Sequence, residues 1–162
     1  MSGLVYRINM KTETPNERGI PKSPVVTAII RHSGIEGDYN RYRSEKCNAD
    51  SDKAIMFIPS DTLDQLSLEG WPVVAGDLGE NITVKGIPYE AFAINQKYAI
   101  GDDALIQIAK PCHPCSGLKV LPYVGQEKLK SFMQTLLNRR GWYARVLKEG
   151  RITVQDRFVL AD

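Results

Sequence analysis

Residues 142–160 read WYARVLKEGRITVQDRFVL and contain two runs that are rich in β-branched, aromatic and other apolar residues. These runs, 142–147 and 152–160, are separated by Glu149-Gly150, a dipeptide that is typical of a turn. The order of strand, turn and strand predicts a hairpin that closes the fold at the C-terminal end of the sequence.

The rest of the chain has the same character, because short apolar runs end repeatedly at glycine, proline or other turn residues. These runs predict further strands at residues 4–8, 25–31, 54–58, 81–85, 90–94 and 104–109. Only two segments favour a helix, one with Ser60 as its N-cap that continues to about Leu68, and one over 126–138. The second segment has an apolar stripe that we expect in the core, made of Leu129, Phe132, Met133, Leu136 and Leu137.

Many short strands and no regular alternation of strand and helix argue against a doubly wound parallel sheet. The sequence therefore predicts a mainly β fold, a closed or nearly closed β-barrel with a few helices. The length of 162 residues fits one domain over residues 1–162.

The charge balance bears on the partners of the protein. Its 21 basic and 19 acidic residues give a net charge of +2, which is too small to indicate nucleic acid as the main partner. A small anionic ligand needs only one or two local cations and stays compatible with this balance.

No apolar run approaches the roughly 18 residues of a membrane span, and residues 1–19 lack the apolar core of a signal peptide. We therefore expect a cytoplasmic protein without a membrane partner.

The stretch KPCHPCSGL, residues 110–118, holds two of the three cysteines and one of the two histidines. A thioredoxin-like redox pair would need a helix to begin at the first cysteine, and Ser116, Gly117 and Pro122 oppose such a helix. A structural zinc site usually takes two closely spaced pairs of ligands, and the sequence contains one such pair. Three cysteines cannot all pair within the chain, and thiols are expected in a reducing compartment.

Two interpretations of this stretch remain open from the residues alone. A rigid, proline-framed loop directly after a strand can hold one thiol in place as a nucleophile or as a metal ligand. Alternatively, both cysteines are small apolar side chains that fill the core, as free cysteines often do.

Four stretches together resemble the MOSC family, the domain first described at the C-terminus of molybdenum cofactor sulfurases. They are GIEGD (34–38), GDLGENITV (76–84), the segment from Ile100-Gly101-Asp102 to Pro114-Cys115, and GWYARV (141–146). Their order and spacing match the family pattern, most strongly over residues 20–162. The chain resembles a short, stand-alone bacterial-type member, and the resemblance implies a barrel of the MOSC type with a role in sulfur or molybdenum-cofactor chemistry.

The resemblance also implies which residues form the site. The cysteine that follows a proline in the third stretch is Cys115, which in relatives is proposed to carry a persulfide sulfur or to ligate molybdenum. His113 is then a candidate proton donor or ligand, and Arg145 a candidate for stabilising the thiolate or gripping an anion. The other residues implied in cofactor binding are Asp38, Gly79, Glu80 and Asn81. Cys112 occupies a position where many relatives have an arginine.

The function implied by the resemblance is binding of the molybdenum cofactor (molybdopterin) or a related anionic, sulfur-bearing small ligand, with Cys115 as the reactive thiol. The family association extends to molybdenum ion binding and pyridoxal phosphate binding, and a cysteine desulfurase is the expected sulfur donor. Such a protein is a sulfur transferase or a component of a molybdenum-cofactor-dependent oxidoreductase. Two alternatives are a ligand-binding module without turnover that uses the same pocket, and a redox protein that uses both Cys112 and Cys115.

Overall fold

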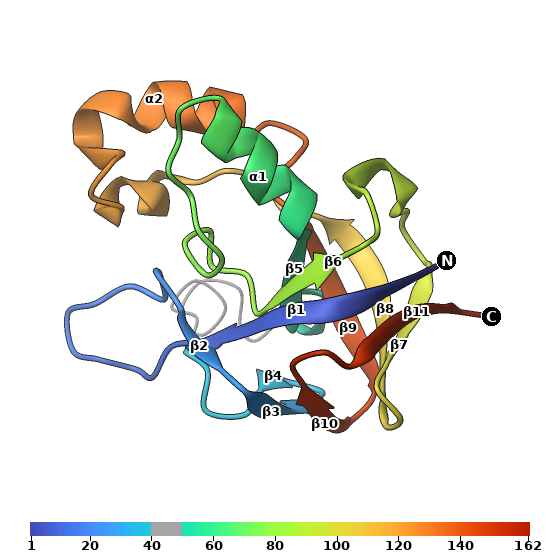
Figure 1. The fold of residues 1–162 in the computed structure, drawn as a ribbon. Coiled ribbons are helices and arrows are strands. Elements are labelled where there is room, and N and C mark those ends of the chain that lie inside the picture. Colours follow the sequence, from blue (N-terminus) through green and yellow to red (C-terminus); the bar gives the residue numbers. More distant parts are fainter. Residues whose placement is uncertain (40–49) are drawn as a thin grey trace.

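Seven strands close into a barrel in the computed structural model, which describes residues 1–39 and 50–162 (Figure 1). Their order around the barrel is β11-β7-β8-β9-β5-β6-β1, and β1 pairs back with β11 to close it. Of the barrel pairs, β5 and β6 are parallel and the others are antiparallel. The barrel strands are β1 (Ser2–Met10), β5 (Ile55–Pro59), β6 (Ile82–Lys85), β7 (Lys97–Ile100), β8 (Ala104–Pro111), β9 (Trp142–Lys148) and β11 (Arg157–Ala161).

Smaller elements decorate this barrel. The short strand β2 (Ser23–Val25) pairs with β1 and extends the barrel sheet at one point. A separate three-stranded sheet contains β3 (Thr27–Arg31), β4 (Gly34–Ile35) and β10 (Gly150–Thr153). The helices are α1 (Ser60–Leu68) and α2 (Gly125–Thr135), with 3-10 turns η2 (Ser51–Lys53), η3 (Tyr89–Ala91) and η4 (Ser116–Val120). Figure 1 shows α1 and α2 on the same side of the barrel.

Two hydrophobic cores result from this arrangement. The first fills the barrel, where Phe57, Tyr98 and Phe158 are fully buried and their rings pack against one another or against neighbouring rings. The second joins the barrel to the helices and includes Phe132 together with Cys112, which is 1% exposed. Burying one large apolar side chain stabilises a fold by about 1.5–3 kcal/mol, so both cores are substantial sources of stability.

The prediction of a mainly β barrel with a few helices is confirmed, and both helices form near their expected positions. The N-cap of α1 is Pro59 rather than Ser60, whose hydroxyl donates to the Asp61 carboxylate at 3.3 Å. Helix α2 ends at Thr135, before the end of the apolar stripe. Leu137 is consequently 57% exposed, and its predicted place in the core was wrong.

The run 25–31, expected as one strand, divides into β2 and β3. The break lies at Val26, which is 73% exposed and whose carbonyl accepts a hydrogen bond from the Val154 amide at 2.9 Å. Strand β2 pairs with β1 in the barrel, whereas β3 pairs with β10 in the small sheet. Pairing partners that are distant in sequence decide where such a run is divided.

The predicted C-terminal hairpin was also wrong. Strand β9 pairs with β8 and β5, whereas β10 pairs with β3. The run 152–160 divides around Gln155, which has a φ of 77° and forms a turn, so that β11 can pair with both β1 and β7. Closing the barrel satisfies both edges of β11, and a local hairpin would satisfy one edge only.

One further strand was misplaced. The run 90–94 lies around the 3-10 turn η3, whose N-cap is Pro88, whereas the true strand β7 follows at Lys97–Ile100.

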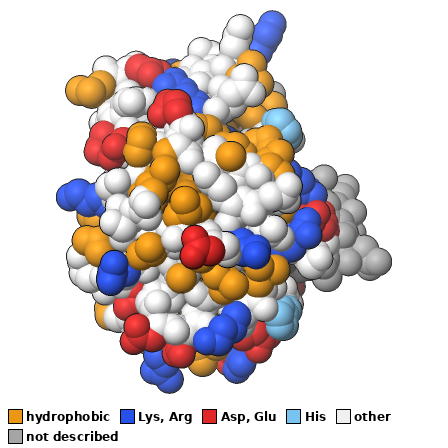
Figure 2. All heavy atoms as spheres, turned by 90° about the vertical axis from the view of Figure 1, so that its right-hand side faces the viewer, with side chains coloured by type: hydrophobic (Ala, Val, Ile, Leu, Met, Phe, Trp, Pro, Cys, Tyr) orange, Lys and Arg blue, Asp and Glu red, His pale blue; other side chains and the backbone are white. Residues whose placement is uncertain are grey.

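Within the part of the chain described here, no helix is sufficiently long and apolar to span a bilayer. Figure 2 shows acidic, basic and hydrophobic side chains interspersed on the face that carries the two termini.

Candidate active site around Cys115

The two neighbouring cysteines occupy opposite environments. Strand β8 ends at Pro111, and the amide of Cys112 then donates to the Gly141 carbonyl at 2.8 Å, which fixes the start of the loop. The Cys112 side chain enters the second core, whereas Cys115 is exposed. The residues after Cys115 were expected to break any helix, but a short 3-10 helix, η4, begins at Ser116. No α-helix begins at Cys112 or Cys115, as a thioredoxin-like pair would need. The third cysteine, Cys47, lies outside the described residues.

Arg140 is a buried cation that donates a hydrogen bond to the backbone of this loop. Only 6% of the residue is exposed, and its guanidinium donates to the carbonyl of His113 at 2.5 Å and to that of Leu78 at 3.2 Å. Arg140 therefore joins the cysteine loop to the GDLGENITV loop. Its Nε is also buried and has no hydrogen-bond partner among the described residues. A buried charge held in this way acts on nearby groups with little screening by solvent.

The electrostatic surroundings of Cys115 favour its thiolate. Partial burial of the sulfur opposes ionisation, but the charge and hydrogen bond of Arg140, the Gly117 amide and the charge of Arg18 outweigh it. The pKa of Cys115 is consequently lowered from its ordinary value. A Cβ built at Gly117 would lie 3.4 Å from both Cys115 Sγ and Arg18 Nη1, so the sulfur and this second guanidinium converge on the glycine.

The pKa of Cys112 is shifted in the opposite direction. Burial raises the pKa of its thiol, and this effect exceeds the opposing influence of Arg140 and of the Tyr143 hydroxyl. Its sulfur lies 3.8 Å from Met56 Sδ and 3.8 Å from the His113 carbonyl oxygen. Burial also raises the pKa of Tyr143. One thiol of the pair is thus accessible with a lowered pKa, and the other is buried with a raised pKa.

Asp38 and Asn81, two of the expected site residues, lie together in a buried polar network. The Lys22 ammonium is 2.6 Å from both carboxylate oxygens of Asp38, and their side chains are only 1% and 2% exposed. The Asn81 amide nitrogen donates to Asp38 at 2.9 Å, while its amide oxygen accepts from the Met56 amide at 3.2 Å. Since Met56 also contacts Cys112, this network is connected to the inner side of the cysteine loop.

Glu80 is fully buried beside this network, and its carboxylate accepts from the Gly76 amide at 2.6 Å and from the Thr83 hydroxyl at 3.3 Å. Its second oxygen has no hydrogen-bond partner among the described residues. Burial raises the pKa of Glu80 to about 7, so the carboxyl is largely protonated below neutral pH. Gly79 has a φ of +89°, and a Cβ there would lie 2.8 Å from Ile20 Cγ2, so this position requires glycine.

Arg145, which was expected to stabilise the Cys115 thiolate or to grip an anion, has a carboxylate partner on the 3-10 helix η2. Its guanidinium is 2.9 Å from Asp52 Oδ1 in a partly exposed ion pair. The cations beside Cys115 are instead Arg140 and Arg18, which sequence reasoning missed. A signal for the first was present, because Arg140 directly precedes GWYARV, but nothing in the pattern distinguished Arg18.

The backbone carbonyl of His113 accepts the hydrogen bond from Arg140 that fixes the loop, and the residue itself is exposed. Within residues 1–39 and 50–162, no three His, Cys, Asp or Glu side chains converge in a way that could hold a metal ion between them. The arrangement around Cys115 suits nucleophilic thiolate chemistry, or a single thiolate ligand offered to an incoming metal.

Comparison with known proteins shows to which family this chain is similar. The MOSC domain model matches residues 37–159, and this family is associated with the molybdenum cofactor. The uncharacterized protein YflK of Bacillus subtilis (strain 168) is 31% identical over 144 residues, which are 85% of this chain and 60% of that protein. A protein named "Reductase" from Gibberella moniliformis (strain M3125 / FGSC 7600) is 34% identical over 87 residues, 54% of this chain. The chain covers only 15% of that protein's length.

Solved structures share the fold of this chain. YiiM from Geobacillus stearothermophilus has a TM-score of 0.73 at 28% identity, covering 99% of this chain and 75% of that one. The YUAD protein from Bacillus subtilis has a TM-score of 0.77 at 14% identity, covering 98% and 94%, and shows likeness of fold alone. Because the family model matches residues 37–159, most of the chain, and covers three of the four motifs in full, the chain belongs to the MOSC domain family.

Proposed function

We propose that the protein binds the molybdenum cofactor, or a related anionic and sulfur-bearing ligand, beside Cys115, and that the Cys115 thiolate carries sulfur or ligates the metal. The observation that carries this proposal is the pairing of an accessible thiol with two guanidinium groups that lower its pKa. Both sulfur carriage and metal ligation require the thiolate rather than the thiol.

The residues present fit such a ligand in two respects. A thiolate is a soft ligand that suits a transition metal, and guanidinium groups are well matched to the phosphate of molybdopterin. Arg18 is half-buried and offers the more accessible cation, while the buried Arg140 sets the charge at the sulfur. When bound, the cofactor would supply redox chemistry at its metal, and the chain would bind and orient it.

Sulfur carriage is the version of this proposal that needs no bound metal. The Cys115 thiolate attacks the outer sulfur of a persulfide on a cytoplasmic cysteine desulfurase. A sulfur–sulfur bond forms at Cys115, and the bond to the desulfurase breaks, which releases the desulfurase cysteine as a thiolate. No net oxidation occurs in this exchange, and the positive charges beside Cys115 stabilise both the attacking thiolate and the persulfide product.

Mass spectrometry after incubation with a cysteine desulfurase and L-cysteine tests the proposal. We expect an addition of about 32 Da, one sulfur atom, on the tryptic peptide that contains both cysteines. The addition should persist in Cys112→Ser and be lost in Cys115→Ser. An unlabelled peptide in wild-type protein, together with Cys115 that resists alkylation, would contradict sulfur carriage and any role as a thiolate ligand.

A redox pair makes a different demand, because both single variants should then lose activity. The contrast in burial between the cysteines favours a single working thiol, since Cys112 is 1% exposed. A ligand-binding module without turnover would keep its affinity for the ligand in Cys115→Ser, so the same two variants distinguish the three functions.

A further inference from the structure

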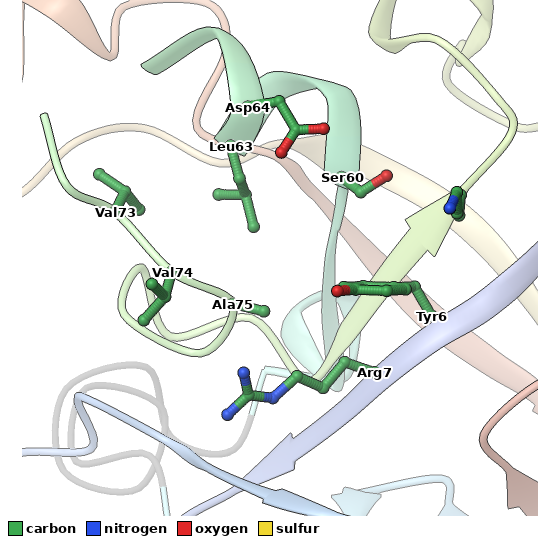
Figure 3. Close-up of a pocket in the computed structure, with 9 residues that line it drawn as sticks. Tyr6, Arg7, Ser60, Leu63, Asp64, Val73, Val74 and Ala75 are labelled. Atoms are coloured by element: carbon green, nitrogen blue, oxygen red, sulfur yellow. The ribbon is translucent and has the colours of Figure 1, made fainter. Parts of the chain in front are cut away.

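We propose that a cavity that shares no residue with the Cys115 site binds a small organic monoanion, a carboxylate on an apolar or aromatic body. This inference is independent of the function proposed above. The cavity measures about 300 Å³ and lies between α1, the strands β1 and β6, and the segment 73–75 (Figure 3). This volume is at the lower end of the range for pockets that bind small molecules.

Two cations line this cavity without a carboxylate partner. Among the described residues neither Arg7 nor Lys85 forms an ion pair, and the Nε of Arg7 is buried without a hydrogen-bond partner. The Lys85 ammonium lies 5.8 Å from the centre of the Tyr6 ring, which holds it near the cavity. An incoming carboxylate would give Arg7 the partner that the protein does not supply, in the fork geometry that guanidinium groups favour.

The apolar residues that line the rest of the cavity indicate what kind of group carries the carboxylate. Tyr6 and Val74, which are 48% and 57% exposed, give the cavity its accessible apolar surface, together with the mostly buried Leu63. The ring of Tyr6 lies across from segment 73–75 in Figure 3. A ligand that consists of charge alone, such as sulfate, would leave this apolar surface uncovered. A flat ring or a short aliphatic chain would cover it and gain the corresponding hydrophobic free energy.

Asp64 limits the charge of the ligand. This carboxylate projects from α1 on the side of the cavity opposite Arg7 (Figure 3). A second anionic group on the ligand would approach Asp64 and be repelled, because like charges at close range in a partly enclosed site are unfavourable. The combination of two cations, one carboxylate on the opposite side and an apolar wall therefore favours a monoanion over a nucleotide or an inorganic phosphate.

A titration of the intact, ¹⁵N-labelled protein with sodium benzoate tests this inference by amide chemical shifts. Benzamide serves as the matched neutral probe, and sodium sulfate as the anion without an apolar body. We expect saturable benzoate shifts at amides of α1 and of segment 73–75, with a dissociation constant of about 1 mM, as is typical of weak fragment-sized binding. Benzamide and sulfate should each bind at least about tenfold more weakly, a difference of 1.4 kcal/mol.

Three variants complete the test. Arg7→Met keeps the aliphatic stem and removes the charge, and we expect it to weaken benzoate binding at least about tenfold. Lys85→Met, a change at an exposed residue, provides a second test should Arg7→Met fold poorly, and Arg151→Met removes an exposed charge outside the cavity as a control. Absence of saturable shifts at the cavity, equal binding of benzamide, or unchanged affinity in both cavity variants would overturn the inference.

Discussion

Substitution Glu80→Gln should make the stability of the protein less dependent on pH, because the wild-type carboxyl is buried where its charge is disfavoured. The introduced carboxamide would keep an oxygen that accepts from the Gly76 amide and the Thr83 hydroxyl. Its nitrogen would take the place of the oxygen that has no hydrogen-bond partner among the described residues. The variant is therefore close to an isostere of the protonated native side chain.

The magnitude follows from the pKa. In the unfolded chain Glu80 loses its proton near the ordinary value of 4.5, whereas burial raises its native pKa to about 7. Between these values the native state binds more protons than the unfolded state, so the free energy of unfolding falls as pH rises and levels off above about pH 7. Since one pKa unit corresponds to about 1.4 kcal/mol, the total loss is about 3 kcal/mol.

Urea denaturation of wild-type and Glu80→Gln protein at pH 4.5 and at pH 8 measures this effect, with the slope m checked for constancy. We expect the variant to be about 3 kcal/mol more stable relative to wild type at pH 8 than at pH 4.5. Glu90→Gln, at an exposed residue, controls for the loss of one negative charge. A stability difference between Glu80→Gln and wild type that is the same at both pH values would refute the reasoning.

Three further substitutions separate the parts of the site. Arg140→Met should raise the pKa of Cys115 and slow its alkylation at pH 7 several-fold, measured by mass spectrometry; an unchanged rate would contradict the role of this cation. Asp38→Asn removes the negative charge beside the buried Lys22 ammonium and should destabilise the protein by about 3–5 kcal/mol in urea denaturation. Arg145→Gln should change stability by less than about 1 kcal/mol and leave Cys115 alkylation unaltered, and slower alkylation would contradict the placement of this residue.

The sequence predicted the class of fold because the evidence for it is local. Short β-rich runs and turn residues recur along the whole chain, and the apolar stripe of α2 has helical spacing. Strand pairing is not local, which is why the hairpin over 142–160 was wrong. Strand β11 leaves its neighbour in sequence and pairs with β1 and β7, and nothing in the residue pattern encodes that closure.

The candidate site was likewise predicted only in part, because its local motif was recognised and its distant residues were not. Cys115 was identified from the resemblance to the MOSC family, and the structure places it at the surface. The cations that act on it come from outside the motifs, since Arg18 lies in the segment after β1 and Arg140 lies between α2 and β9. Arg145 shares a motif with the site, but its guanidinium pairs with the Asp52 carboxylate, an ion pair that the motif itself does not indicate.

The most direct test of the account is the pH dependence of Cys115 alkylation by iodoacetamide in the native protein, followed at each cysteine by mass spectrometry. The account predicts that Cys115 reacts with a midpoint below that of an unstructured cysteine peptide, while Cys112 stays unmodified until the protein unfolds. A Cys115 midpoint equal to or above that of the peptide would show that its thiolate is not stabilised, and would contradict its proposed role in carrying sulfur or ligating a metal.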